Sequence, residues 1–274
     1  MLLYALAALL YLVLAALVWR ARIRGGVTAT VLRIALLVPL TLHGLTLYQG
    51  FFGGDALRFG FGHALSVMLW LAVALYWLES FFLRLDGLLA ITLPLAALAA
   101  LLPAVFGGFV LRDTTSVAFR LHIVAAMAAY SLFTIAMLQA ALMAALERRL
   151  HSIRQLGVST DALAGPLATL PPLLTLERVL FRLIGAGFVL LTLTLLSGIL
   201  FSEQVFGRAL RLDHKTLFAI LSWFIFAGLL IGRWRAGWRG RIAQRWIFAG
   251  FATLLLAYVG SRFVLEVVLQ RTVH

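Results

Sequence analysis

Long runs of apolar residues are the feature of this sequence that most restricts its fold. A helix needs about 20 apolar residues to cross the hydrocarbon core of a bilayer. Inside lipid the backbone must satisfy its own hydrogen bonds, which favours helices. The sequence therefore predicts an all-α, polytopic membrane protein with about eight transmembrane helices. The runs lie at residues 2–18, 28–50, 62–79, 87–106, 116–146, 177–202, 213–232 and 246–268.

The composition supports membrane insertion and excludes several other classes. Of the 274 residues, 64% are hydrophobic and 12% are charged, whereas soluble domains have about 45–50% apolar and roughly 25% charged residues. We therefore expect a single integral membrane domain over residues 1–274, with one long loop at 147–176 between the fifth and sixth runs. The chain has no cysteine, which excludes disulfides, iron–sulfur clusters and thiolate metal sites.

Arginine-rich loops predict the orientation of the helices. The loops that follow the first, third, fifth and seventh runs carry WRARIR, FFLRLD, ERRLHSIR and GRWRAGWRGRIAQR. The positive-inside rule places such loops in the cytoplasm. With an even number of spans, both termini are then outside and the loop 147–176 is cytoplasmic. The net charge of +13 is explained by these loops, and nucleic acid is not an expected partner.

Four of the six histidines lie in or beside the predicted spans. On the predicted topology, His43, His63, His122 and His214 all fall in the outer half of the membrane. Ionisable groups within a bilayer are rare and are often functional, and imidazole is a common ligand of heme iron and other metals. The alternative interpretation is that each histidine forms hydrogen bonds between helices or lies in the headgroup layer.

Heme suits this pattern of histidines better than copper or zinc. Sites for those metals often show closely spaced ligands, but HxxxH and ExxH are both absent from the sequence. A heme needs only two ligands on facing helices. Basic residues at the outer ends of the fifth and seventh spans could pair with its propionates, or could anchor the helices and pair with nearby carboxylates. These residues are Arg112, Arg120, Arg208, Arg211 and Lys215.

Three segments of the sequence resemble one known family. They are FGFGHALSVMLWLAVALYWLES (residues 59–80), FRLHIVAAMAAYSLF (119–133) and the stretch from HKTLFAILSW to SRFVLE (214–266), which contains AGWRGRIA. Together they resemble the cytochrome c assembly membrane proteins (CcsA- and CcmC-like), and within that family the short YpjD-like and HemX-like branch. The resemblance covers most of residues 40–270.

The resemblance implies a heme-binding protein of the bacterial cytoplasmic (inner) membrane that carries or presents heme near the outer face. His122 matches the first outward-facing histidine of the family. His214, in DHKT, stands where the family has the WDPKE-like end of its external loop. These two residues are therefore expected to ligate the iron of heme b. The other residues expected at the cofactor are Arg120, Arg211 and Lys215 at the propionates, and His43 and His63 as a second pair or along a route into the site.

The external loop LFSEQVFGRALRLDHKT departs from the family pattern because it contains no tryptophan. Heme binding is therefore implied more directly than cytochrome c synthase activity, and the sequence offers no catalytic motif. The alternative function is a heme-free transporter or membrane scaffold that assists assembly of a partner complex, and a heme lyase ranks third. The expected partners are membrane lipid, heme, and cytochrome c assembly or respiratory membrane proteins.

Overall fold

The computed structural model describes residues 1–24, 28–52, 58–82, 86–110, 117–155, 173–206 and 214–268. Within these ranges, eight helices are long and apolar enough to cross a membrane, which confirms the predicted all-α, polytopic class. Their bounds are α1 Leu2–Arg24, α2 Ala29–Phe52, α3 Phe61–Glu79, α4 Asp86–Val105, α5 Val117–Gln155, α6 Leu173–Phe206, α7 His214–Ala236 and α8 Gly240–Leu255. After α8, the chain continues as η2 Leu256–Gly260, α9 Ser261–Phe263 and η3 Val264–Val268.

Several helices are longer than the predicted spans. With 39 residues, α5 extends well beyond the ~20 residues that a bilayer requires. It continues to Gln155, and α6 begins at Leu173. The segment predicted as a loop at 147–176 thus includes the ends of two helices, while residues 156–172 lie outside the described part of the chain. Its placement in the cytoplasm stays a prediction.

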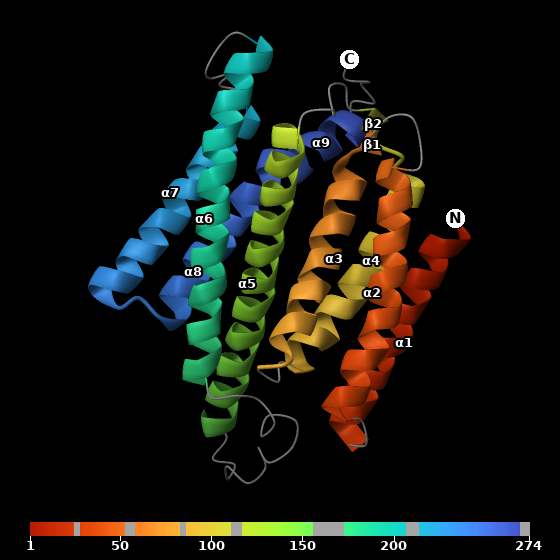
Figure 1. Cartoon of the computed structure of the whole chain (residues 1–274). Coiled ribbons are helices and arrows are strands. Elements are labelled where there is room, and N and C mark those ends of the chain that lie inside the picture. Colours follow the sequence, from red (N-terminus) through yellow and green to blue (C-terminus); the bar gives the residue numbers. More distant parts are fainter. Residues whose placement is uncertain are drawn as a thin grey trace.

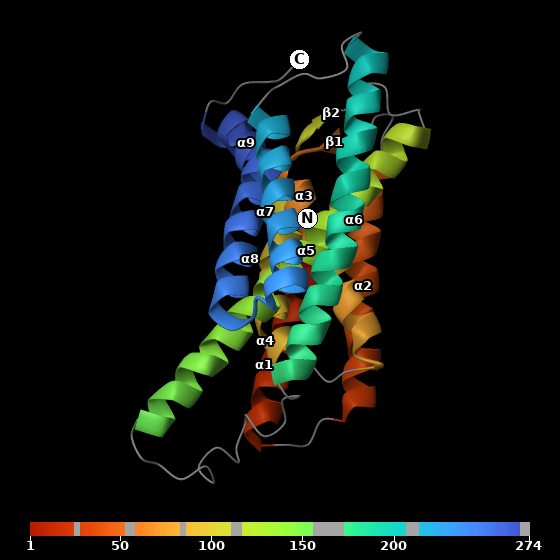
Figure 2. The ribbon, with the colours of Figure 1, turned by 90° about the vertical axis from the view of Figure 1, so that its left-hand side faces the viewer.

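The helices pack as two halves that meet along α3 and α5 (Figure 1). In the first half, α1 packs against α2 and α4, and α3 packs against α2 and α4. In the second half, α5 packs against α6 and α8, and α7 packs against α6 and α8. Each half is therefore closed by contact between its first and fourth helices. Figure 2 shows the second half from the side, with α6, α7 and α8 facing the viewer.

A short antiparallel strand pair joins two connections at one end of the first half. β1 (Arg58–Phe59) precedes α3, and β2 (Phe109–Val110) follows α4. Gly108, just before β2, has a φ of 63°, a backbone conformation that favours glycine. A Cβ atom at Gly108 would lie 2.9 Å from the backbone nitrogen of Gly60. Glycine at this position thus permits the close approach of the two connections.

Two phenylalanine rings form the centre of the second half. Phe133 of α5 and Phe226 of α7 stack with their ring centroids 3.9 Å apart, and both are fully buried. Glycines on the flanking helices make room for them: a Cβ at Gly187 of α6 would lie 3.1 Å from Phe133, and one at Gly250 of α8 would lie 2.8 Å from Phe226. All four helices of this half therefore contribute to or pack against this one pair of rings.

The close contact at Gly250 leads to a stability prediction. Gly250→Ala places a methyl group against the Phe226 ring, and overpacking of this kind costs about 1–3 kcal/mol. Gly185→Ala is the matched control, because no atom lies within 4 Å of a Cβ at that position. We expect a lower thermal midpoint in detergent for Gly250→Ala alone. Equal midpoints for the two variants would contradict the packing.

The stretch AGWRGRIA forms the tight connection between α7 and α8. Gly237 and Gly240 have φ values of 62° and 53°, so both occupy the left-handed region that glycine tolerates best. Trp238 between them packs so closely over Gly232 of α7 that a Cβ there would lie 2.3 Å from its ring. This turn allows α8 to begin at Gly240, before the start predicted at residue 246.

The arginine-rich segments and the histidines His63, His122 and His214 lie toward opposite ends of the bundle. The carboxyl ends of α1, α3, α5 and α7, which precede or carry the arginine-rich segments, lie at one end of the bundle (Figure 1). The amino ends of α3, α5 and α7, with their histidines, lie at the other end. We call these the arginine end and the histidine end. The assignment of the arginine end to the cytoplasm stays a prediction from the positive-inside rule.

The absence of native cysteine makes this orientation testable with single-cysteine variants. His214 begins α7, Arg239 lies in the turn that follows this helix, and both residues are exposed. In intact cells, a membrane-impermeant thiol reagent should label His214→Cys and should label Arg239→Cys only after the membrane is opened. The reverse pattern would overturn the predicted orientation.

Candidate functional site

The four membrane histidines differ in their surroundings, although all lie toward the histidine end. His63, His122 and His214 are in the first two turns of α3, α5 and α7, and His43 lies deeper, in α2. His43 and His63 are buried in the first half of the bundle, at 0% and 4% exposure. His122 is half-buried and His214 is exposed, both in the second half.

His43 lies within a polar network inside the first half. Its Nδ1 is 3.4 Å from the hydroxyl of Tyr11 on α1, and its Nε2 is 2.8 Å from the hydroxyl of Ser66 on α3. The Tyr11 ring also packs edge-on against the imidazole. Both ring nitrogens thus contact hydroxyl groups, as expected for a buried polar side chain. This geometry favours an interhelical structural role for His43.

Glycines lie close to both nitrogens of the His63 ring. A Cβ at Gly108 would lie 3.1 Å from its Nδ1, and one at Gly50 would lie 3.8 Å from its Nε2. The Phe59 ring packs nearby, with its centroid 6.5 Å from that of the imidazole. A porphyrin on either nitrogen would require this packing to open. The expected second ligand pair of His43 and His63 therefore lies in dense surroundings.

His122 is held by a hydroxyl group of the neighbouring helix. Its Nδ1 is 2.8 Å from Oγ of Ser197 on α6, and that hydroxyl donates to the carbonyl of Thr194 at 3.1 Å. Because the serine proton is directed to the carbonyl, Oγ is placed to accept a proton from Nδ1. This pattern favours the tautomer whose lone pair is on Nε2. A heme-ligating histidine has the same requirement.

The helix surface beside His122 combines small and aromatic residues. A Cβ at Gly198 would lie 3.5 Å from Cε1 of His122, so the imidazole lies directly along α6. Farther along α6, Trp223 of α7 donates to the hydroxyl of Thr192 at 2.9 Å and stacks on Phe188 with centroids 5.3 Å apart. α6 is therefore the helix that connects the neighbourhood of His122 with α7.

His122 and His214, the two expected ligands, lie near the starts of two different helices, α5 and α7. In Figure 2, the first turns of α5 and α7 lie on opposite sides of α6. Arg120 is exposed near the start of α5, and Lys215 is half-buried at the start of α7, so each predicted propionate partner lies beside one histidine. Arg211, the third such residue, lies outside the described residues.

Some site residues were not found from the sequence. Ser197, Tyr11 and Ser66 contact the histidines from other helices, 75, 32 and 23 residues away in the chain. A signal for Ser197 exists in hindsight, because it forms a Ser-Gly step inside an otherwise apolar span. In the described ranges, no three residues among His, Cys, Asp and Glu gather closely enough to hold a metal ion.

Comparison with known proteins identifies the family. The model of the Cytochrome C assembly protein family matches residues 1–269. The chain belongs to this family. The matched range includes the AGWRGRIA turn and the first turns of α3, α5 and α7. No solved structure matches the chain.

Individual relatives match parts of the chain. The inner membrane protein YpjD of Escherichia coli K12 is 39% identical over 99 residues, 36% of this chain and 37% of that protein. An uncharacterized 28.8 kDa protein of Azospirillum brasilense is 34% identical over 149 residues, which is 54% of this chain and 52% of the relative. The cytochrome c biogenesis protein CcsA of Gloeobacter violaceus is 33% identical over 92 residues, 34% of this chain and 27% of CcsA.

The matched segment spans a little over a third of the YpjD proteins. Together with eight helices able to cross a membrane, the likeness to named inner membrane proteins and the family membership identify a multi-pass inner membrane protein.

The network around His43 predicts that this residue contributes to stability. His43→Ala removes a buried ring and leaves the hydroxyls of Tyr11 and Ser66 without it, which costs about 2–4 kcal/mol. We expect a clear fall in the thermal midpoint of the purified protein. A midpoint equal to that of the wild-type protein would contradict the structural role of His43.

Proposed function

We propose that this protein binds heme b near the outer face of the bacterial inner membrane and carries or presents it for cytochrome c assembly. Family membership supports the connection with cytochrome c assembly, and the positive-inside rule supports the outer location of the histidine end. His122 is the first proposed axial ligand. The second is His214, which lies at the same end of the bundle and is exposed.

The contact between His122 and Ser197 carries the proposal. Metal-ligating histidines nearly always donate their other ring N–H to a fixed acceptor, which sets the tautomer and the direction of the ring. Ser197 is placed to be that acceptor at 2.8 Å, and its own proton is directed to Thr194. In this arrangement His122 presents Nε2 to the iron. The dense packing around His43 and His63 provides no comparable arrangement.

The position of His214 adds a conformational requirement to the proposal. Because Figure 2 shows the first turns of α5 and α7 on opposite sides of α6, we propose that these helix ends approach each other when one iron binds both imidazoles. Heme would supply a low-spin iron with two imidazole ligands. Arg120 and Lys215 would pair with its propionates, and Arg211 is proposed for the same role from its place in the sequence.

Absorption spectroscopy of variants tests this function. Protein produced with added heme should show a Soret band and the pyridine hemochrome spectrum of heme b. The band should disappear in His122→Ala and in His214→Ala, while His151→Ala, which removes a histidine at the far end of α5, should retain it. Ser197→Ala should weaken heme affinity about 10–100-fold, the range for outer-shell partners of metal ligands, and Ser197→Thr should restore it.

Specific outcomes would reject the proposal. A folded wild-type protein with no Soret band after heme supply would refute heme binding. A stoichiometric partner complex isolated from such heme-free protein, unaffected by the histidine substitutions, would favour the scaffold function. Loss of the band in His122→Ala with full retention in His214→Ala would refute ligation by two histidines and leave His122 as the ligand.

A further inference from the structure

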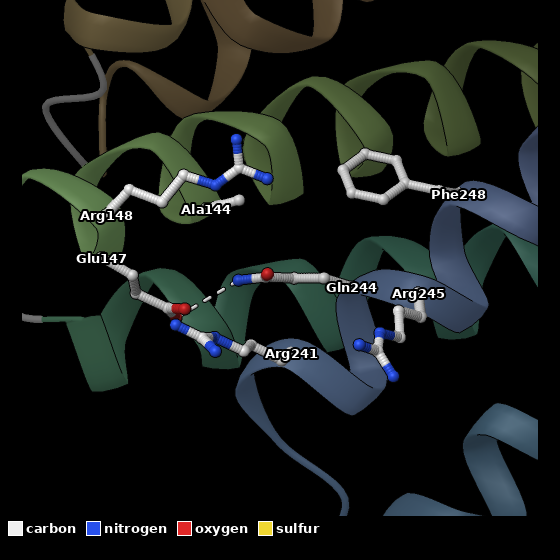
Figure 3. A pocket seen from close by; sticks show the side chains of 7 residues that line it. All are labelled: Ala144, Glu147, Arg148, Arg241, Gln244, Arg245 and Phe248. Atoms are coloured by element: carbon white, nitrogen blue, oxygen red, sulfur yellow. Dashed lines mark hydrogen bonds between the residues drawn. The ribbon is translucent and has the colours of Figure 1, made fainter.

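A polar pocket opens between α5 and α8 at the arginine end (Figure 3). Its volume is about 380 Å³. The pocket lies between the last turns of the apolar part of α5 and the first turns of α8. It is far from the histidines of the proposed heme site and plays no part in that proposal. The residues that line it are Ala144, Glu147, Arg148, Arg241, Gln244, Arg245 and Phe248.

The charges in the pocket favour an anion. Arg148, Arg241 and Arg245 contribute three positive charges and Glu147 one negative charge, so the lining has a formal charge of +2 (3 − 1). All three arginines are exposed, and their guanidinium groups can therefore reach a ligand. Glu147 accepts a hydrogen bond at 3.2 Å from Gln244 across the pocket, which links α5 to α8 and fixes the two walls.

The start of α8 adds to this positive potential. Arg241 lies in the first turn of α8, whose N-cap residue Arg239 provides no side-chain hydrogen bond to the helix. The first amide groups of a helix carry a partial positive charge and bind anions readily. This helix end therefore adds to the positive potential of the three arginines, and both favour an anion in the pocket.

The pocket is basic at one end and apolar at the other, which matches the charged headgroup and the apolar acyl chains of a phospholipid. Its arginines are close to the ends of the membrane helices, whereas Ala144 and Phe248 lie on the membrane side of Arg148 and Arg245 along α5 and α8. Phe248 is 37% exposed and offers an apolar wall that a hydrated phosphate ion does not need. Basic pockets between membrane helices on the cytoplasmic side bind anionic lipid headgroups.

We propose that this pocket binds the phosphate headgroup of an anionic phospholipid, with its acyl chains along Ala144 and Phe248. The arginines would form charge-assisted hydrogen bonds with the phosphate oxygens. On the predicted topology the lipid belongs to the cytoplasmic leaflet. Bound lipid would hold the end of α5 against the start of α8, beside the hydrogen bond between Glu147 and Gln244.

Lipid binding can be measured by native mass spectrometry of the full-length protein titrated with phosphatidylglycerol or with phosphatidylcholine of the same chain length. We expect phosphatidylglycerol to bind more tightly than phosphatidylcholine. The double variant Arg241→Gln/Arg245→Gln should lose about five-fold in affinity for phosphatidylglycerol per arginine removed, the effect of roughly one charge near a membrane surface. Arg235→Gln, which removes an exposed charge at the same end but outside the pocket, should stay within two-fold of wild type.

Several outcomes of these binding measurements would refute the lipid proposal. Equal affinity for the two lipids, or an equal loss in the double variant and in Arg235→Gln, would refute it. Displacement of phosphatidylglycerol by millimolar inorganic phosphate would assign the pocket to a free anion instead. If the double variant does not fold, the exposed Arg148→Gln replaces it, with the same five-fold loss expected. Phe248→Ala should weaken phosphatidylglycerol binding but leave any binding of inorganic phosphate unchanged, which separates the two sources of phosphate.

Discussion

Every polar group that enters the lipid-spanning part of this protein must find its partner within the protein, because the bilayer core offers no water. At several positions this partner is a carbonyl of another helix, which accepts a hydrogen bond from a side chain. Trp77 donates to Arg33 at 3.0 Å, Gln139 to Leu176 at 2.8 Å and Tyr130 to Leu254 at 2.7 Å. The last of these bonds lies just before the π-helical segment that begins at Leu256. Tyr130 thus binds a carbonyl where the regular α-helix ends.

The same requirement explains why histidines at one end of the bundle differ in their suitability for a ligand. In the closely packed first half, His43 has hydroxyl contacts at both nitrogens and serves the internal hydrogen-bond network. In the second half, Nδ1 of His122 lies 2.8 Å from Oγ of Ser197. A hydrogen bond from one ring nitrogen orients an imidazole whose other nitrogen binds a metal, which is the basis of the role proposed for His122.

The fold could be predicted from the sequence to a large extent because a membrane span is a local property. About 20 apolar residues in succession predict a helix without knowledge of its neighbours, and all eight spans were found in this way. The start of α8 was misplaced by six residues, since the turn at Gly237 and Gly240 depends on positive φ angles and on Trp238 packing over α7. These are contacts between helices, which hydropathy does not report.

The candidate site was less accessible to sequence analysis for the same reason. The shared end of the four histidines follows from counting spans. The contact between His122 and Ser197 joins residues 75 positions apart, and the pocket at the arginine end joins Glu147 to Gln244 across 97 positions. The position of α6 relative to the first turns of α5 and α7 in Figure 2 also depends on how the helices pack. Ligation by His122 and His214, and the roles of Arg120 and Lys215, stay predictions.

The contact between α1 and α4, and the corresponding contact between α5 and α8, bear on how the chain assembles. Helices leave the ribosome in order, so α1 enters the membrane well before its partner α4 exists. Each half can close only when its fourth helix has been inserted, and until then Tyr11 and His43 belong to an incomplete bundle. Synthesis of α4 and of α8 thus marks two points at which a half of this protein becomes a packed unit in the bilayer.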